Sequence, residues 1–519
     1  MEEDRKPFVY SIIHIGSSNL SMRIVEYHDV DDIRIIEEVK RDTAFGEEVF
    51  LTRKLSFSSI RKLCNQLNGL KQLMADYQVE EHAVYATAVL REAENRRSIM
   101  DLIKDTTGFD VQVIDMPQEI YYKHFALQHA LARVHEKDKP AWKPDLLFVD
   151  ITSGCVGLTV WDKGTLRYQH NVHIGTLRLL ETFKRNQRDS KDYPAAMTEY
   201  IHAILEPLWR DIRRFQPDTL IFSGREARIM AELLQLDLGP DNMAYIRPEP
   251  FYRLYEETGR MSAPMIMRKY NISEQWASTV APTLHIYKEI LENICTEKVL
   301  MMGTTFIEAV TMFYGAKKME DPSLEEMRGH NLELTRSIAD AYYYEPAHAK
   351  ALESYSHSIS SALQAKSAVT DRDEFLLRMA IILYQTGKYV NLLNSNLHAW
   401  NLVRGTDIFG ISDREKDMVA AIVYYDHKGT PSDDDEPFRI LNESAKRTVL
   451  KLIAIFRIIR AMDMSRRQKL KDVTARIQNG ELLIEYDSRE NTALETWMFD
   501  QQKEFFENIF GRMARLERR

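Results

Sequence analysis

Two short turns of small residues, each placed between two β-type runs, constrain this chain more than any other feature. The first covers residues 14–19 (HIGSSN) and the second residues 150–155 (DITSGC). A tight turn of this kind exposes consecutive backbone N–H groups, which bind anions and phosphate above all. Gly and Ser also favour ordinary hairpins. Because the two turns stand in matching strand contexts, they predict a duplicated phosphate clamp.

Composition narrows the classes of protein to consider. The chain has 519 residues, 44% of them hydrophobic and 28% charged, and a formal net charge of −9. This balance excludes a disordered type and argues against a general nucleic-acid binder, although a local basic channel would still accept a polyanion. The three cysteines, Cys64, Cys155 and Cys295, have no metal-site spacing. We expect a cytoplasmic protein with no signal peptide, no membrane contact and no nucleic-acid partner.

The order of patterns along the chain predicts three domains. Residues 7–140 alternate strand and helix signals, and residues 145–315 restart the same pattern with a hairpin, a turn and a further strand. Residues 325–465 are almost entirely helical in pattern. We therefore predict two α/β lobes, residues 1–142 and 143–320, followed by a helical domain, residues 321–519.

Two further segments carry a resemblance to a known family. Residues 86–95 (ATAVLREAEN) and residues 173–178 (HIGTLR), taken with the two turns, resemble the exopolyphosphatase and guanosine pentaphosphate phosphohydrolase family. The resemblance implies a two-lobed actin-like (ribonuclease H-like) α/β fold followed by a mainly helical HD-like domain. It also implies hydrolysis of a terminal phosphate from inorganic polyphosphate or guanosine pentaphosphate, with Mg²⁺ as cofactor. A homodimer is compatible with the resemblance.

The resemblance assigns roles to individual residues. It places the carboxylate that activates water at Glu119, and Asp150 as the residue that binds the metal or orients water. The other interpretation of Glu119 is an ordinary first-turn glutamate, favoured there by the helix dipole. Arg91, at the end of a strand predicted for residues 86–90, is a candidate phosphate contact, or an ion-pair partner of Glu94 or Glu119. The candidate phosphate-binding groups in the turns are Gly16, Ser17, Ser18, Asn19, Ser153, Gly154, Cys155, Ser223 and Gly224.

Several positions depart from the family's pattern. His14 stands where the family has Asp, and Thr152, Ser153 and Cys155 stand where it has Gly, Gly and Ser. Gly157 takes the place of a second acidic residue. A β-branched Thr disfavours the positive φ and the close approach that a phosphate loop uses. These departures keep a second hypothesis open: a pseudo-enzyme that binds polyphosphate or a guanosine alarmone as a sensor without hydrolysing it.

Two alternatives find less support in the residues. A sugar or acid kinase would share the fold, but nothing else in the chain supports that activity. Cys155 lies at the centre of its turn, yet no His–Cys pairing that would activate a nucleophile is visible in the sequence.

The helical domain departs from the family as well. Tyr384 and Gln385 occupy the place of the His-Asp doublet that an HD-type metal site uses. Without the doublet, we expect His398, His427 and Asp463 to have structural roles. Residues 457–476 are rich in Lys and Arg and form either a basic channel for polyphosphate or a solvated helix face.

Overall fold

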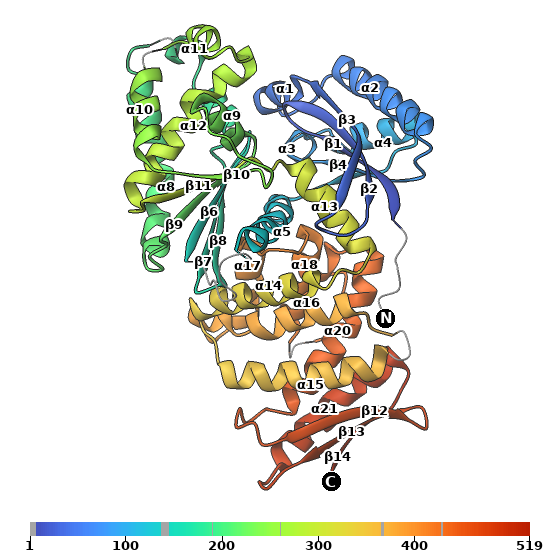
Figure 1. The fold of residues 1–519 in the computed structure, drawn as a ribbon. Helices are drawn as coiled ribbons and strands as arrows, with labels where there is room; N and C mark the ends of the chain where they lie inside the picture. Colours follow the sequence, from blue (N-terminus) through green and yellow to red (C-terminus); the bar gives the residue numbers. More distant parts are fainter. Residues whose placement is uncertain (1–6, 136–144, 189, 260, 365–367, 427–428) are drawn as a thin grey trace. The chain divides into compact units, whose positions relative to one another are not determined.

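The computed structural model describes residues 7–135, 145–188, 190–259, 261–364, 368–426 and 429–519 (Figure 1). The chain divides into two compact units, residues 1–327 and residues 328–519. His427 lies outside the described residues. None of the described helices combines the length and the apolar character that a bilayer crossing requires.

The first sheet of unit 1 begins with the predicted hairpin. It has five strands in the order β3-β2-β1-β4-β5. Strand β1 pairs antiparallel with β2 and parallel with β4, so that the first turn lies at the end of the central strand. Buried aliphatic residues on β1 and β2 form its core. The strands are β1 (Phe8–Ile15), β2 (Asn19–Tyr27), β3 (Ile33–Asp42), β4 (Glu81–Ala86) and β5 (Val111–Val113).

The second sheet repeats this plan. Its six strands run in the order β10-β11-β9-β6-β7-β8, so β8-β7-β6-β9-β11 matches the order of the first sheet. Strand β6 again pairs antiparallel with the strand that follows the turn and parallel with a later strand. The duplication predicted from the sequence is thus confirmed in strand order. The strands are β6 (Leu146–Ile151), β7 (Val156–Asp162), β8 (Thr165–Val172), β9 (Thr219–Ser223), β10 (Met243–Ile246) and β11 (Lys298–Met302).

Helices cover both sheets, and in Figure 1 helices α5 and α13 lie between them. Helix α5 places His124 against Phe148 and Trp161 of the second sheet, and it also packs on α13. The helices of unit 1 are α1 (Phe45–Thr52), α2 (Phe57–Asp76), α3 (Ala88–Arg91), α4 (Arg96–Thr107), α5 (Met116–His135), α6 (Thr176–Thr182), α7 (Arg185–Arg188), α8 (Tyr193–Arg213), α9 (Arg225–Leu233), α10 (Glu249–Thr258), α11 (Ala263–Tyr270), α12 (Glu274–Asn293) and α13 (Phe306–Lys318).

One element of unit 1 differs from the sequence prediction, and a second packs on the sheet that is distant from it in sequence. The strand expected at residues 86–90 ends at Ala86, and residues 88–91 form helix α3, because Leu90 and Arg91 donate their N–H groups to the Thr87 carbonyl. Helix α13 follows the second sheet in sequence but packs on β1 and β2 of the first. The Tyr10 hydroxyl donates to the carbonyl of Thr311 on this helix at 2.5 Å.

Unit 2 is mainly helical, with a small sheet near the chain end. Helix α14 (Ser323–Asp340) crosses the boundary, and the remaining helices are α15 (Pro346–Gln364), α16 (Asp371–Leu383), a 3₁₀ turn η1 (Thr386–Tyr389), α17 (Ser395–Gly405), α18 (Asp413–Tyr424), α19 (Glu436–Arg439), α20 (Glu443–Ala461) and α21 (Ala493–Phe510). The sheet order is β12-β13-β14.

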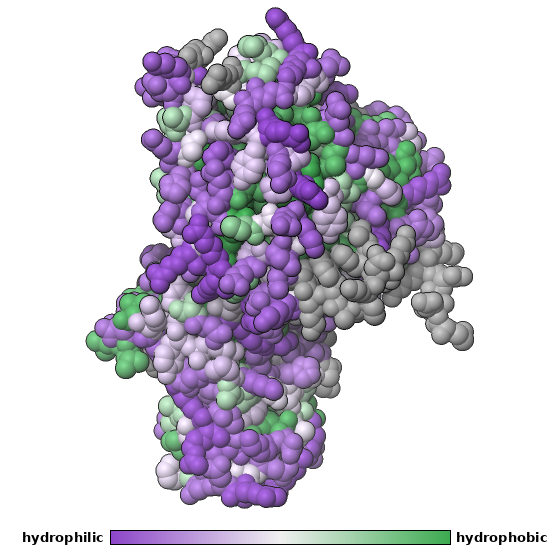
Figure 2. Space-filling view, turned by 60° about the vertical axis from the view of Figure 1, so that its left-hand side comes forward, coloured by the Kyte–Doolittle hydropathy of each residue, from purple (hydrophilic) through white to green (hydrophobic). Residues whose placement is uncertain are grey.

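The small sheet joins a hairpin to one further strand. Strands β12 (Lys471–Gln478) and β13 (Glu481–Asp487) form an antiparallel hairpin. Gly511 ends α21 in a left-handed conformation, and strand β14 (Ala514–Arg518) then pairs parallel with β13. On the face that Figure 2 displays, most side chains are hydrophilic and the apolar ones form separate patches.

Candidate functional site

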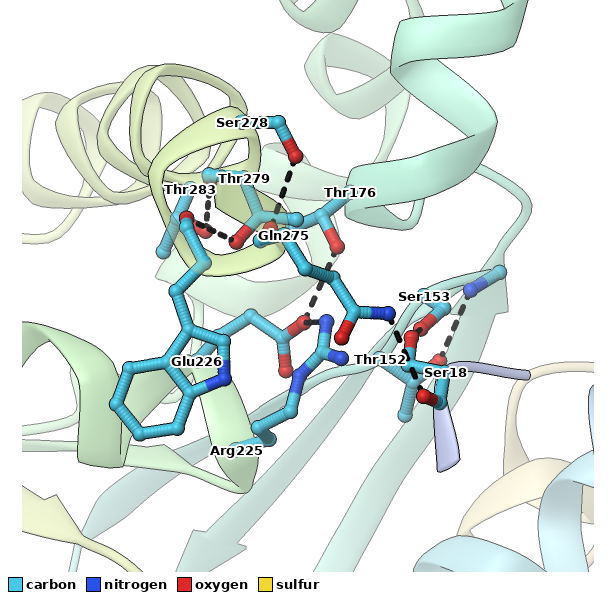
Figure 3. Close-up of polar contacts among 12 residues, drawn as sticks. Ser18, Thr152, Ser153, Thr176, Arg225, Glu226, Gln275, Ser278, Thr279 and Thr283 are labelled. Atoms are coloured by element: carbon cyan, nitrogen blue, oxygen red, sulfur yellow. Dashed lines mark hydrogen bonds and ion pairs between the residues drawn. The ribbon is translucent and has the colours of Figure 1, made fainter. Parts of the chain in front are cut away.

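The two Gly/Ser turns face each other across a cleft between the two sheets of unit 1. The hydroxyls of Ser18 and Ser153 lie 3.4 Å apart, and Gln275 of α12 donates its amide N–H to the Ser18 carbonyl at 3.3 Å (Figure 3). Residues from both turns line a cavity of about 120 Å³. A cavity measured in this way needs about 10–15 Å³ to hold one water molecule, so this one has room for several waters or for a small polar group.

Unused backbone donors line this cavity. Among the hydrogen bonds of the described residues, the N–H groups of Ser17, Ser18 and Ser153 have no protein acceptor. All these residues line the cavity. The other turn donors are used internally: Gly16 N–H donates to the Asn19 carbonyl at 2.9 Å. The first turn thus contributes two unused N–H groups and the second turn one, and groups of this kind bind anions.

The second turn is held together by its threonine. The Thr152 hydroxyl accepts the N–H groups of Gly154 at 3.4 Å and Cys155 at 3.1 Å. No residue of either turn has a positive φ, so the β-branched side chain is compatible with the turn. Glycine is needed instead at position 175, where an added Cβ would lie 2.3 Å from the Cys155 nitrogen.

Glu119 lies in the first turn of α5, with its side chain buried and lining the cavity. Its Oε2 atom lies 3.3 Å from the Arg91 guanidinium, which also donates to the Ile114 carbonyl at 2.8 Å. Arg91 is not among the cavity-lining residues. The geometry therefore gives Arg91 the ion-pair contact with Glu119, and its contact with phosphate remains a prediction.

Asp150 is fully buried and already paired. Its oxygens accept from the Lys123 ammonium at 2.9 and 2.8 Å, and one also accepts from the Ser223 hydroxyl at 2.6 Å. Burial disfavours the charged form of Lys123, but the Asp150 and Glu119 carboxylates outweigh it and raise the pKa of Lys123. Gly224 has φ +93°, and an added Cβ there would lie 3.2 Å from Asp150 Oδ1. A left-handed glycine thus lets the backbone approach this pair.

Burial keeps His14 and Cys155 neutral. Burial, with the nearby Lys123 charge, lowers the pKa of His14 to about 3, and its Nε2 lies 3.0 Å from the Thr87 hydroxyl. Burial and the Glu119 charge raise the pKa of the Cys155 thiol to about 12. A thiol held in this state is a poor nucleophile.

Cationic side chains from one strand and two helices line the same cavity. Lys40 of β3 and Arg225 and Arg228 of α9 line it together with Lys123. Arg225 pairs with Glu226 at 2.7 Å, and Arg228 pairs with Glu308 at 3.0 Å. Burial lowers the pKa of Lys40, and the charges of Arg225 and Arg228 lower it further. These cations therefore gather where a polyanion would enter.

The donor set does not fit Mg²⁺. This ion takes six oxygen ligands in near-ideal octahedral geometry, but both Asp150 oxygens already accept from Lys123. Among the described residues, no group of three or more His, Cys, Asp or Glu side chains could hold a metal ion. At position 157 an added Cβ would lie 2.2 Å from Ile120 Cδ1, so Ile120 occupies the space that an acidic side chain would need. We derive no step through Mg²⁺.

The structure brings together part of the predicted set. Gly16, Ser17, Ser18, Asn19, Ser153 and Glu119 line the cavity, whereas Asp150, Gly154, Cys155, Ser223, Gly224 and Arg91 are not among its lining residues. Sequence reasoning missed Lys123, Lys40, Arg225 and Arg228. One signal could have found Lys123: it lies four residues after Glu119, and residues at this spacing share one face of a helix.

Unit 2 contains a separate buried polar cluster. His348 places Nδ1 2.6 Å from an Asp463 oxygen and Nε2 2.6 Å from the Tyr384 hydroxyl. Gln468 donates its backbone N–H to the other Asp463 oxygen at 2.7 Å. All of His348, Tyr384 and Asp463 are buried. Tyr384 thus completes a chain of hydrogen bonds that runs through His348 to Asp463.

The basic segment of unit 2 is extensively paired. Arg457 is buried and donates to the Tyr425 carbonyl at 3.0 Å. Lys469 pairs with Glu495 at 3.1 Å, and Arg467 pairs with Glu490 at 2.8 Å. These contacts give the cations structural partners within unit 2, and the basic channel remains a prediction.

Comparisons with known proteins fit this geometry. Residues 22–305 match the Ppx/GppA phosphatase family, and residues 333–503 match domain III of Ppx/GppA phosphatase. A guanosine-5'-triphosphate,3'-diphosphate pyrophosphatase of Photobacterium profundum is 19% identical over 425 residues, which make up 81% of each chain.

Solved structures show the same fold. An exopolyphosphatase from Cytophaga hutchinsonii matches with a TM-score of 0.53 and 18% identity, covering 60% of this chain and 98% of that one. A Ppx/GppA family member from Aquifex aeolicus matches with a TM-score of 0.50 and 19% identity, covering 60% of this chain and 99% of that one. The actin-like α/β fold expected from the sequence is confirmed.

Proposed function

Because the chain belongs to the Ppx/GppA phosphatase family, we propose that it removes the terminal phosphate of inorganic polyphosphate or guanosine pentaphosphate in the cleft between its two sheets. One observation carries the proposal. The unused N–H groups of Ser17, Ser18 and Ser153 line the same cavity as the buried carboxylate of Glu119. Hydrolysis of a phosphoanhydride needs both, because the phosphate must be held while water is oriented toward it.

In this proposal each group has one task. The N–H groups of the two turns bind the oxygens of the terminal phosphate, one turn on each side. Glu119 accepts a hydrogen bond from the attacking water and takes its proton. Arg91 contacts only the Oε2 atom of Glu119, which leaves Oε1 for the water. The ammonium of Lys123 offsets negative charge on the phosphate oxygens.

A specific observation favours binding without hydrolysis as the second candidate. Both carboxylates that the family resemblance assigns to catalysis are already in ion pairs, Glu119 with Arg91 at 3.3 Å and Asp150 with Lys123 at 2.8 Å. A carboxylate that already accepts hydrogen bonds from a cation has fewer lone pairs left to orient a water molecule. In this candidate the cleft is a sensor for polyphosphate or a guanosine alarmone.

Phosphate release separates the two candidates. Purified protein is incubated with long-chain polyphosphate and, separately, with guanosine pentaphosphate, and free phosphate is measured. We expect Glu119→Gln to lower the release rate by about 100-fold or more, the range for loss of a general base. Glu94→Gln is the matched control, because Glu94 is an exposed glutamate that pairs with Lys54 at 3.8 Å.

Two results of the phosphate-release assay would change the proposal. Release that is unchanged by Glu119→Gln would remove Glu119 from the proposed mechanism. Binding of either substrate with no release by the wild-type chain would replace the hydrolase proposal with the sensor proposal.

The cellular location is part of the same proposal. Cys64, Cys155 and Cys295 are all free thiols. Free cysteines are typical of proteins in a reducing compartment, which supports the cytoplasm.

A further inference from the structure

We propose that the Lys123 ammonium is the resident cation of this cleft: it holds Asp150 and offers its remaining N–H to a phosphate oxygen, so that phosphate binding requires no divalent ion. The inference rests on the proposed function for the class of ligand, a terminal phosphate group. What it adds to the proposed function is the identity of the cation that accompanies the phosphate.

The geometry gives Lys123 one donor to spare. An ammonium has three N–H donors, and two of them bond the Asp150 oxygens at 2.9 and 2.8 Å. Within the described part of the chain, the third has no protein acceptor. Lys123 is buried but lines the cavity, so a ligand in the cavity is the partner available to this donor.

The position of Lys123 is enforced from several sides. The Ser223 hydroxyl donates to Asp150 at 2.6 Å and so helps to orient the carboxylate to which Lys123 donates. On α5, Lys123 lies one helical turn after Glu119, so both side chains face the cleft. Gly224 has no Cβ, and one placed there would lie 3.6 Å from the ammonium nitrogen.

The local charges leave little attraction for a further cation. Asp150 is neutralised by Lys123, Glu119 by Arg91, and Glu226 accepts from Arg225 and from the Thr176 hydroxyl. Arg228 is paired with Glu308, and Glu38 is paired with Arg23, whereas Lys40 adds its positive charge to the same cavity. Hydrogen bonds from charged donors to phosphate are stronger than those from neutral donors. The cleft therefore supplies its own countercharge for a phosphate.

Titration calorimetry with inorganic phosphate tests the proposal. The full-length protein is treated with EDTA and dialysed, and phosphate is titrated in EDTA and again in millimolar Mg²⁺. We expect dissociation constants that agree within about threefold, which is less than 1 kcal/mol. Lys123→Met should weaken binding by about tenfold or more in both buffers, because a charge-assisted hydrogen bond is lost.

Two further variants guard against misfolding. Lys123→Met combined with Asp150→Asn removes both charges of the buried pair, and its loss of binding should equal that of the single variant. Lys104→Met, which changes an exposed lysine of α4 paired with Asp110, should bind like the wild-type protein.

Several results would overturn the inference. Wild-type binding that disappears in EDTA and returns with Mg²⁺ would show that the site takes a metal. Binding unchanged in both Lys123 variants, or no phosphate binding in either buffer, would equally contradict it. The hydrolase proposal fails by a different result, because phosphate binding without release from polyphosphate leaves this inference standing.

Discussion

Each unit contains a buried aspartate, Asp150 in the cleft and Asp463 in unit 2, and the partners of the two carboxylates differ. Asp150 in the cleft is paired with Lys123, which keeps a free N–H toward a cavity. Asp463 in unit 2 accepts hydrogen bonds from His348 and Gln468, and the other ring nitrogen of His348 is hydrogen-bonded to the Tyr384 hydroxyl. One aspartate has a cationic partner that a ligand can reach, whereas the other belongs to a saturated and buried chain.

The difference lies in what surrounds each carboxylate. In the cleft, Lys123 and the N–H groups of the two turns line a cavity, which is the basis for the proposed anion site. In unit 2, the tyrosine at position 384 fills the space with a neutral hydroxyl packed against Phe456. We therefore assign a ligand to the first region and a structural role to the second.

The largest effect should come from breaking the cleft pair. Lys123→Met leaves the Asp150 carboxylate buried with only the Ser223 hydroxyl as a side-chain donor. Removing one partner of a buried ion pair costs about 3–5 kcal/mol. Urea unfolding should show this loss, and adding Asp150→Asn should recover most of it. A loss below about 1 kcal/mol would mean that the pair behaves like a surface ion pair.

Breaking the unit 2 cluster should cost less. His348→Leu removes the partner of both Asp463 and Tyr384, but Asp463 keeps the two N–H donors of Gln468 at 2.7 and 3.1 Å. We expect a loss of about 2–3 kcal/mol in the free energy of unfolding. Phosphate binding should stay within about twofold of wild type. Abolished phosphate binding in a folded variant would contradict a purely structural role for the cluster.

Acid should weaken the cleft through His14. Its pKa falls from 6.5 to about 3 in the folded chain because of burial and the Lys123 charge. Between these values the unfolded chain binds the proton and the folded chain does not, so stability decreases as the pH falls. From about pH 7 to pH 5 the decrease is about 2 kcal/mol. His14→Gln should remove this part of the pH dependence, and an unchanged slope would place the titration elsewhere.

The strands and the turns were predictable because alternation and small-residue turns are local patterns. The duplicated strand order around β1 and β6 follows from them. The short helix at residues 88–91 was missed, because its apolar residues fit a buried strand equally well. Only the hydrogen bonds to the Thr87 carbonyl distinguish the helix from a strand. The packing of α13 on the first sheet is a tertiary choice that no local pattern encodes.

The sequence predicted the backbone turns of the candidate site but not the ion pairs around them. The serines of both turns line the cavity as expected from their sequence context. Lys123 on helix α5 and Asp150 on strand β6 are 27 positions apart in the sequence. The discovery of their pairing required the three-dimensional position of α5, since a lysine on a helix is usually solvent-exposed.

The most direct test is a crystal structure of Glu119→Gln with tripolyphosphate, grown in the presence of Mn²⁺ and measured at the manganese absorption edge. We predict a terminal phosphate between Ser18 and Ser153 with one oxygen on the Lys123 ammonium, and no anomalous peak at Asp150. An anomalous peak at about 2.1 Å from an Asp150 oxygen, with Lys123 displaced, would contradict the account.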